Sequence, residues 1–152
     1  MIIASKCPYR ISLLGGSSDL DWFVNEHGKG ISIGFSINAY STLFLKYRNS
    51  GNRGILNYSS REEYSDIETI SHPIIRSCFS KYKLSNPIEL ASFGDDISGA
   101  GLGSSSSFTV ALINAINSLS KVQKSNYELA KAASEIEIEN LKNPIGRQDQ
   151  FL

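Results

Sequence analysis

SGAGLGSSSSF, from Ser98 to Phe108, places three glycines at alternate positions before four serines and the start of an apolar run. The apolar residues that follow recur every three or four positions, as on one face of a helix: Phe108, Ala111, Leu112, Ala115, Ile116 and Leu119. The segment before it, Pro87 to Phe93, has the composition of a short strand. A strand, a glycine-rich turn and a helix N-terminus predict an anion site, because unpaired backbone amides and the helix dipole meet there.

The spacing of the glycines separates this turn from two common phosphate loops. A P-loop requires G-x-x-x-x-G-K-[ST], but no lysine follows Gly103. A dinucleotide fingerprint requires G-x-G-x-x-G, whereas Gly99, Gly101 and Gly103 alternate. The alternative is a connector whose serines only cap a helix, with Ser104 as the cap. We favour phosphate binding, because glycine admits phosphate to the backbone and serine hydroxyls add donors or a magnesium ligand.

The rest of the chain predicts strands first and helices later. Tyr9 to Leu14 has the composition of a strand, and Arg53 to Ser60 is a further candidate. Gly30 to Tyr47 alternates apolar and polar residues, which predicts two strands or one long bent ribbon. Helices are expected over His72 to Tyr82, and from an S-x-x-E capping box at Ser125 to about Lys142. We expect one domain of the α+β class, with a mixed sheet packed by helices.

Composition and charge narrow the class of ligand. The 152 residues are 41% hydrophobic, and 15 basic residues balance 15 acidic ones. Zero net charge disfavours nucleic acid and anionic membranes as partners, so a small molecule is expected. Cys7 and Cys78 lie far apart without metal-ligand spacing, and we expect them to be reduced and structural. Neither a signal-peptide pattern nor a long apolar run is present, which predicts a cytoplasmic protein of undetermined oligomeric state.

Three segments resemble motifs of the GHMP kinases, the superfamily of galactokinase, homoserine kinase and mevalonate kinase. GAGLGSSSS, Gly99 to Ser107, is similar to the family's G-L-G-S-S motif, although Ile97 and Ser98 stand where a proline commonly opens that loop. PYRISLLGGSSDL, Pro8 to Leu20, resembles the N-terminal substrate motif. EIEIENLKNPIGRQDQF, Glu135 to Phe151, resembles the acidic helix and G-[KR]-Q-D-Q motif of the heptose and fucose kinase branch.

The resemblance implies the fold shared with domain 2 of ribosomal protein S5, and an ATP- and Mg²⁺-dependent activity. The loop would wrap the ATP phosphates with Gly99, Ala100, Gly101, Leu102, Gly103, Ser104, Ser105 and Ser106. Ser105 or Ser106 would reach the metal. Glu135, Glu137 and Glu139 compete as its carboxylate ligand. Helical periodicity does not choose between Glu137 and Glu139, because they flank the apolar stripe on opposite sides. The family's spacing, counted back from Pro144, selects Glu137.

The resemblance also assigns two residues to the chemistry. Asp149 matches the family's active-site aspartate, which accepts the proton of the substrate hydroxyl or orients that hydroxyl. Its alternative role is that of a turn former. Arg10 matches an arginine near the transferred phosphate, where its guanidinium would stabilise negative charge. A surface salt bridge is the alternative for Arg10.

Four further residues are implied to bind the substrate. Gly15 and Gly16 would let the backbone approach a sugar whose hydroxyls donate to Asp19. An Asx turn is the alternative role of Asp19, and Asp21 is the neighbouring acidic residue. Arg147 would hold a substrate phosphate, or serve a structural or surface role.

The expected reaction is phosphorylation of the anomeric hydroxyl of a sugar, with heptose 7-phosphate preferred over fucose or galactose. Members of the family are about twice this length, so we expect a C-terminal domain to be absent and this segment to have weak or no turnover. A non-catalytic sugar or nucleotide sensor is the rival function. RNA binding, suggested by the ribosomal relative, is disfavoured by the neutral charge.

Overall fold

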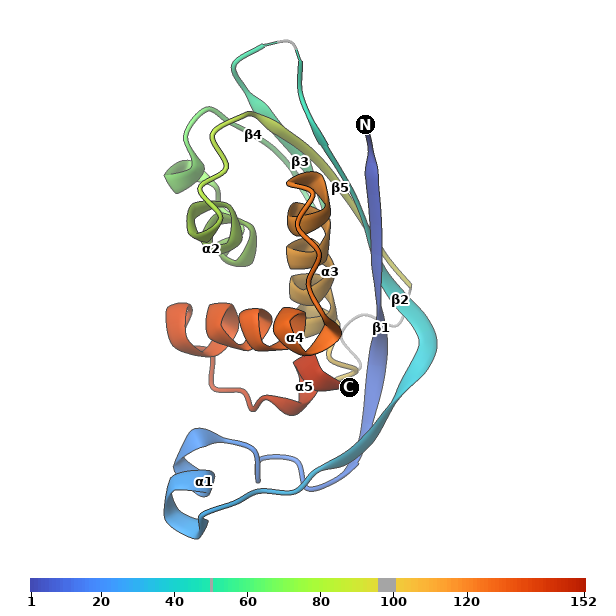
Figure 1. The fold of residues 1–152 in the computed structure, drawn as a ribbon, viewed down its shortest axis with the longest axis vertical. Coiled ribbons are helices and arrows are strands. Elements are labelled where there is room, and N and C mark those ends of the chain that lie inside the picture. Colours follow the sequence, from blue (N-terminus) through green and yellow to red (C-terminus); the bar gives the residue numbers. More distant parts are fainter. Residues whose placement is uncertain (50, 96–100) are drawn as a thin grey trace.

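The computed structural model describes residues 1–49, 51–95 and 101–152, which form a sheet with helices on one face (Figure 1). Gly99 and Ala100 of the expected phosphate loop lie outside the described residues. The strands are β1 (Ile3–Leu14), β2 (Ile33–Tyr47), β3 (Gly54–Asn57), β4 (Arg61–Tyr64) and β5 (Ile88–Gly94). The helices are α1 (Asp21–His27), α2 (Pro73–Lys81), α3 (Ser104–Leu119), α4 (Asn126–Ser134) and α5 (Gln148–Phe151), with a 3-10 turn, η1 (Ile67–Thr69), and a π-helical segment, η2 (Glu135–Asn140).

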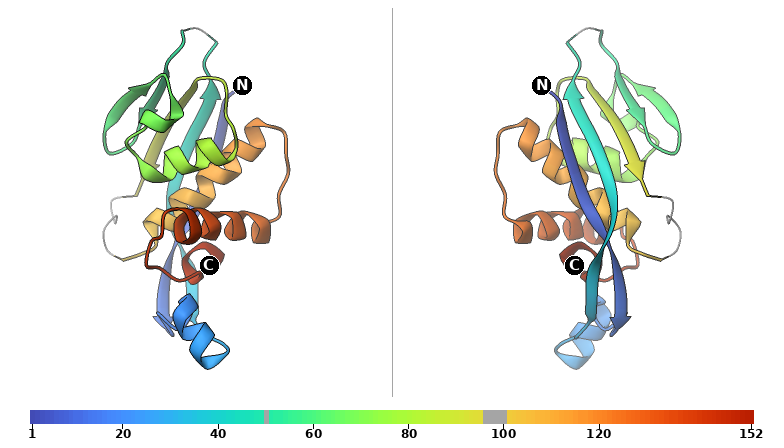
Figure 2. Two further views of the ribbon diagram at one scale, coloured as in Figure 1. Left: turned by 90° about the vertical axis from the view of Figure 1, so that its left-hand side faces the viewer. Right: turned by 90° about the vertical axis from the view of Figure 1, so that its right-hand side faces the viewer.

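The sheet has the order β1-β2-β5-β3-β4 and is mixed. β3 and β5 pair in parallel, and every other neighbouring pair is antiparallel. β1 and β2 run past the helical layer as a twisted ribbon with α1 at its far end (Figure 2). This arrangement confirms the α+β fold class expected from the sequence.

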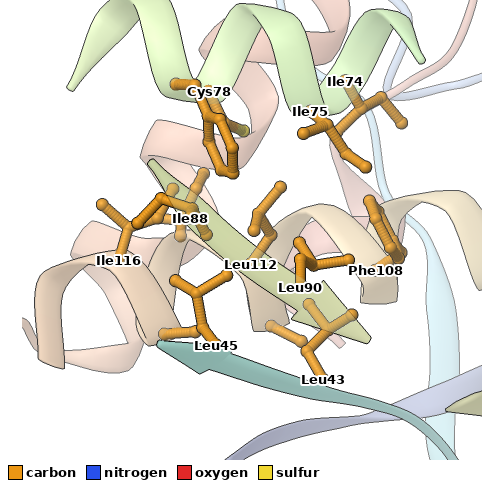
Figure 3. Close-up of a cluster of buried hydrophobic side chains, with 14 of the residues drawn as sticks. Leu43, Leu45, Ile74, Ile75, Cys78, Ile88, Leu90, Phe108, Leu112 and Ile116 are labelled. Carbon is orange, nitrogen blue, oxygen red and sulfur yellow. The ribbon is translucent and has the colours of Figure 1, made fainter. Parts of the chain in front are cut away.

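The core lies between the sheet and helices α2 and α3, and it follows from the alternation along the strands. Alternate residues near the end of β2 and the start of β5 are fully buried against the helices, as are apolar residues of the helices that face them (Figure 3): Leu43, Leu45, Ile88, Leu90, Ile75, Cys78, Leu112 and Ile116. Burial of one such aliphatic side chain contributes about 1.5–3 kcal/mol to folding. Close packing and the hydrophobic effect therefore stabilise this layer.

Most expected elements are present, and the differences are local. Gly30 to Tyr47 contains one long strand, the second of the two alternatives expected there, and α3 begins four residues before Phe108. The expected helix from Ser125 is present with both capping-box hydrogen bonds, but its last six residues form η2. The sequence pattern did not predict α1. Among the described residues, no helix combines the length and apolar character needed to cross a membrane.

An irregularity in β1 turns a charged residue inward. The pairing with β2 shifts register between Pro8 and Arg10. As a result the consecutive residues Tyr9 and Arg10 are both buried, whereas a regular strand would place them on opposite faces. Such irregularities commonly re-aim a side chain beside a functional site.

Candidate active site

The glycine loop ends at Gly103, which is also the N-cap of α3. Its φ of 71° lies in the left-handed region, which favours glycine, and a Cβ there would meet the Arg10 guanidinium at 3.2 Å. Gly103 and not Ser104 occupies the N-cap position, and the described residues show no side-chain cap hydrogen bond there, so the alternative that Ser104 serves as the cap is wrong. At Gly103 the backbone of the loop can therefore pack directly against β1.

The serines that open α3 have different partners. The Ser105 hydroxyl donates to Glu137 Oε1 at 2.9 Å, and Ser107 donates to the carbonyl of Pro8 at 2.7 Å. Ser106 accepts a hydrogen bond from Gln150 Nε2 at 3.0 Å. Of the two serines expected to bind metal, Ser105 is the one whose hydroxyl contacts the expected carboxylate.

Glu137 points into the protein because η2 has wider turns than an α-helix. The amide of Leu141 bonds the carbonyl of Ile136 at 3.0 Å, five residues back. Both Ile136 and its neighbour Glu137 are 0% exposed. Glu137 Oε2 accepts a hydrogen bond from Gln150 Nε2 at 2.7 Å, so each oxygen of the carboxylate has one hydrogen-bond donor. Glu139 instead lies outside, with Oε1 3.9 Å from Arg147.

Ser105 and Glu137 supply two hard oxygen donors close together. Mg²⁺ holds its ligands at about 2.0–2.1 Å in an octahedron, so adjacent ligands lie about 2.9 Å apart, which matches the separation of Ser105 Oγ and Glu137 Oε1. Mg²⁺ usually takes one or two carboxylates and completes its shell with water and phosphates. In the described part of the chain, no three His, Cys, Asp or Glu side chains gather as a metal site. The pair therefore fits magnesium that arrives with a nucleotide.

Arg10 and Asp149 form a two-pronged ion pair, although 139 positions separate them in the sequence. Arg10 Nε and Nη2 donate to the two Asp149 oxygens at 2.8 and 2.6 Å. Arg10 Nη1 donates to the carbonyl of Gly101 at 2.7 Å, and its backbone amide donates to the carbonyl of Leu102 at 3.0 Å. The side chains of Arg10 and Asp149 are only 11% and 18% exposed, so this is a partly enclosed contact rather than a surface salt bridge.

A cleft of about 510 Å³ opens beside this ion pair. Its walls come from β1, the turn after β1, the glycine loop and the segment that leads into α5: Arg10, Ile11, Ser12, Gly16, Ser17, Asp19, Leu20, Gly101, Leu102, Pro144, Ile145, Gly146, Gln148 and Asp149. Two of the expected substrate residues, Gly16 and Asp19, therefore share a cavity with both expected catalytic residues.

Asp19 offers an acceptor to this cleft. Its Oδ2 accepts from the amide of Gln148 at 2.7 Å. Its Oδ1 is buried and has no hydrogen-bond partner among the described residues. Gly146 packs against this carboxylate so closely that a Cβ would overlap it. An unpaired buried acceptor is costly, and a ligand hydroxyl would satisfy it.

Gly15 and Arg147 do not line the cleft. Gly15 has a φ of 80° and no room for a Cβ, because it packs against the backbone of Ile31. It therefore shapes the turn. Arg147 Nη2 lies 3.4 Å from Asp21 Oδ1, with Glu139 on its other side, and its side chain is 42% exposed. These contacts fit the structural or surface role considered for Arg147, and its role in holding a substrate phosphate stays a prediction.

The two glutamines of α5 were not identified as site residues from the sequence. Gln148 accepts from the Ser12 hydroxyl at 2.9 Å, and Gln150 binds Glu137 and Ser106. Their position on either side of Asp149 was the only available signal. We call Gln148, Asp149 and Gln150, with their partners Asp19, Arg10 and Glu137, the α5 junction.

The cysteines take no part in this site. Both are free, as expected. Burial raises the pKa of the Cys7 thiol to about 11, and burial followed by the charge of Glu137 raises the pKa of Cys78. Both thiols are therefore protonated and unreactive near neutral pH.

Several known proteins with similar sequences or folds are kinases. The chain is 29% identical to the D-glycero-alpha-D-manno-heptose 7-phosphate kinase of Campylobacter jejuni, over 98% of this chain and 47% of that protein. A D-glycero-D-manno-heptose 1-phosphate kinase from Bacteroides thetaiotaomicron has a similar structure, with a TM-score of 0.84 and 24% identity over 99% of this chain and 52% of that one. Galactokinase from Lactococcus lactis, solved with galactose, gives a TM-score of 0.78 and 20% identity over 99% and 41% of the two chains.

These similarities agree with the geometry of the cleft. The chain spans about half the length of the curated relative that it matches. The family model described as GHMP kinases N terminal domain matches residues 72–152, more than half of the chain, and includes α3, Glu137 and α5. The chain therefore belongs to the GHMP kinase N-terminal domain family.

Proposed function

We propose that this chain carries the ATP- and sugar-binding elements of a kinase that phosphorylates the anomeric hydroxyl of a sugar. The observation that carries the proposal is the contact of Arg10 with both Asp149 and the Gly101 carbonyl. It places a carboxylate and a guanidinium where the glycine loop meets the Asp19 cleft. Phosphoryl transfer requires this kind of positioning and charge stabilisation more than covalent chemistry.

The nucleotide would lie along the glycine loop and the start of α3. Backbone amides there are suited to phosphate oxygens because the loop contains Gly101 and Gly103 and the helix dipole points toward it. Ser105 and Glu137 would hold Mg²⁺, with Ser106 as the second candidate hydroxyl. The metal would neutralise phosphate charge and keep the phosphates in one orientation.

The sugar would occupy the cleft, where Asp19 Oδ1 would accept a hydrogen bond from a sugar hydroxyl and Gly16 would leave room for the ring. Asp149 would orient the attacking hydroxyl, since each carboxylate oxygen can accept a second hydrogen bond besides the one from Arg10. Arg10 would then stabilise negative charge on the transferred group. This division of roles needs no strong base, in line with a loose transition state.

The preferred substrate is D-glycero-D-manno-heptose 7-phosphate. The support is the activity by which the Campylobacter jejuni relative is named, together with the G-R-Q-D-Q segment from Gly146 to Gln150. Among the described residues, Arg10 is the only arginine or lysine that lines the cleft. Arg147 would need to leave Asp21 and Glu139 to bind a substrate phosphate. Fucose and galactose are the alternative sugars.

The test is ADP release with heptose 7-phosphate, fucose and galactose, measured on this chain and on any longer protein that its gene encodes. We expect release with one sugar and its loss in Asp149→Asn. Weak turnover by this chain beside strong turnover by a longer protein would support a role for further residues in the nucleotide site. Binding of ATP or sugar without any release by the longer protein would contradict the kinase and favour a sensor.

A further inference from the structure

We propose that Gln150 is a positioning residue that holds the Glu137 carboxylate ready for Mg²⁺; this inference rests on the proposed function. Its amide donates to Glu137 Oε2 at 2.7 Å and to Ser106 Oγ at 3.0 Å. Gln150 is 6% exposed, and both acceptors belong to fully or nearly fully buried residues. One side chain thus connects the expected metal carboxylate to the helix that follows the glycine loop.

The chemistry of the partners determines the orientation of the amide. An ionised carboxylate can only accept, so the nitrogen of Gln150 must face Glu137. The two N–H bonds of that nitrogen are then both used, one by each acceptor. The Gln150 oxygen faces the opposite way, 3.4 Å from the hydroxyl of Ser134 on α4. A residue held at both ends in this manner cannot rotate without breaking several contacts.

The contact leaves the metal-facing oxygen available. Gln150 binds Oε2 of Glu137, whereas Ser105 contacts Oε1. The amide therefore fixes the rotation of the carboxylate about its terminal bond, which is otherwise broad. It also lowers the cost of keeping a charge in a position that is 0% exposed. Partners that orient a metal ligand in this way commonly change metal affinity 10- to 100-fold when they are removed.

The same short helix supplies a matched control. Gln148 lies two residues earlier on α5 and uses its side chain on Ser12 at the cleft instead of on Glu137. Replacing either glutamine by methionine removes the amide at nearly constant volume. A difference between the two variants therefore reports the contact to Glu137 rather than a general loosening of α5.

The experiment is Mn²⁺ binding in the presence of ADP, followed by electron paramagnetic resonance. We expect Gln150→Met to weaken Mn²⁺ binding at least about tenfold, and Gln148→Met to stay within about twofold of the unmodified chain. Equal affinity of the unmodified chain and folded Gln150→Met would overturn the inference while leaving the proposed function intact. Absence of Mn²⁺ binding by the unmodified chain in the presence of ADP would contradict the proposed function, and this inference with it.

A second variant covers the case in which Gln150→Met does not fold. Gln150→Asn keeps an amide but shortens the side chain by one methylene, so that its nitrogen no longer reaches Glu137 and Ser106 together. We expect Mn²⁺ binding in the presence of ADP to weaken at least about tenfold. Unchanged Mn²⁺ affinity in folded Gln150→Asn would overturn the inference.

Discussion

The apolar core and the α5 junction are held together by different kinds of contact. The core between the sheet and α3 consists of interlocking aliphatic side chains, many of them 0% exposed. The α5 junction instead depends on particular donors and acceptors, such as the Arg10 and Asp149 pair and the amide of Gln150. A core contact can be replaced by another of similar volume, but a lost donor leaves its acceptor unpaired. Stability should thus reside mainly in the core, and ligand binding in the junction.

The largest effect on activity should follow a change at the junction that leaves the core intact. Asp149→Asn keeps the shape of the side chain but removes the charge that faces Arg10 and the reacting hydroxyl. We expect kcat to fall on the order of 10²–10⁴-fold, with circular dichroism unchanged. Full activity of Asp149→Asn would remove the junction from the chemistry.

The reverse pattern is expected in the core. Leu112 is 0% exposed on α3, and Leu112→Ala should lower the free energy of unfolding by about 2–5 kcal/mol. ADP affinity should not change at temperatures where the variant is folded. Leu112→Met, which nearly conserves volume, should cost less than about 1.5 kcal/mol and serves as the control. A specific loss of ADP affinity in folded Leu112→Ala would contradict the view that the core contributes to stability and not to ligand binding.

A smaller change at the junction should separate sugar binding from nucleotide binding. In Gly146→Ala the new Cβ would overlap the Asp19 carboxylate and push it away from the amide of Gln148. We expect the KM for the sugar to rise on the order of tenfold, as for the loss of one hydrogen bond to a charged group. The KM for ATP, measured in the same assay, is the internal control. Equal increases in both values would indicate a general disturbance of the site.

The smallest effect is expected at an exposed polar contact outside both regions. Hydrogen bonds from the backbone of Ser125, then from Lys124, hold the pKa of Glu128 at about 2, below its ordinary 4.5. A lowered pKa in the folded state means that the ionised carboxylate stabilises the protein above about pH 4.5, and that this contribution disappears as the pH falls toward 2. Thermal melts should show Glu128→Gln below the unmodified chain by a few degrees at pH 7, with the difference vanishing near pH 2. A constant difference would mean that packing is responsible.

The two regions also differ in how far the sequence predicts them. The alternation through Leu43 and Leu45 in β2 and the spacing from Phe108 to Leu119 predicted the core layer, because both segments keep their ideal periods there. At the junction those periods fail: the shift before Arg10 turns consecutive β1 residues inward, and η2 turns Glu137 inward. Periodicity therefore could not choose between Glu137 and Glu139. The motif resemblance identified these residues, but not the contacts of Gln148 and Gln150.

The separation of Arg10 from Asp149 along the chain has a consequence for the order of assembly. β1 lies at the beginning of the chain, whereas its partner lies 139 positions later, so the ion pair cannot form during synthesis until α5 has left the ribosome. Closing so long a loop is entropically unfavourable unless the intervening sheet has already brought the ends together. The sheet must therefore form before the Arg10 and Asp149 ion pair can assemble. During refolding, nucleotide binding should appear after the core has formed, and a nascent chain should be inert until α5 docks.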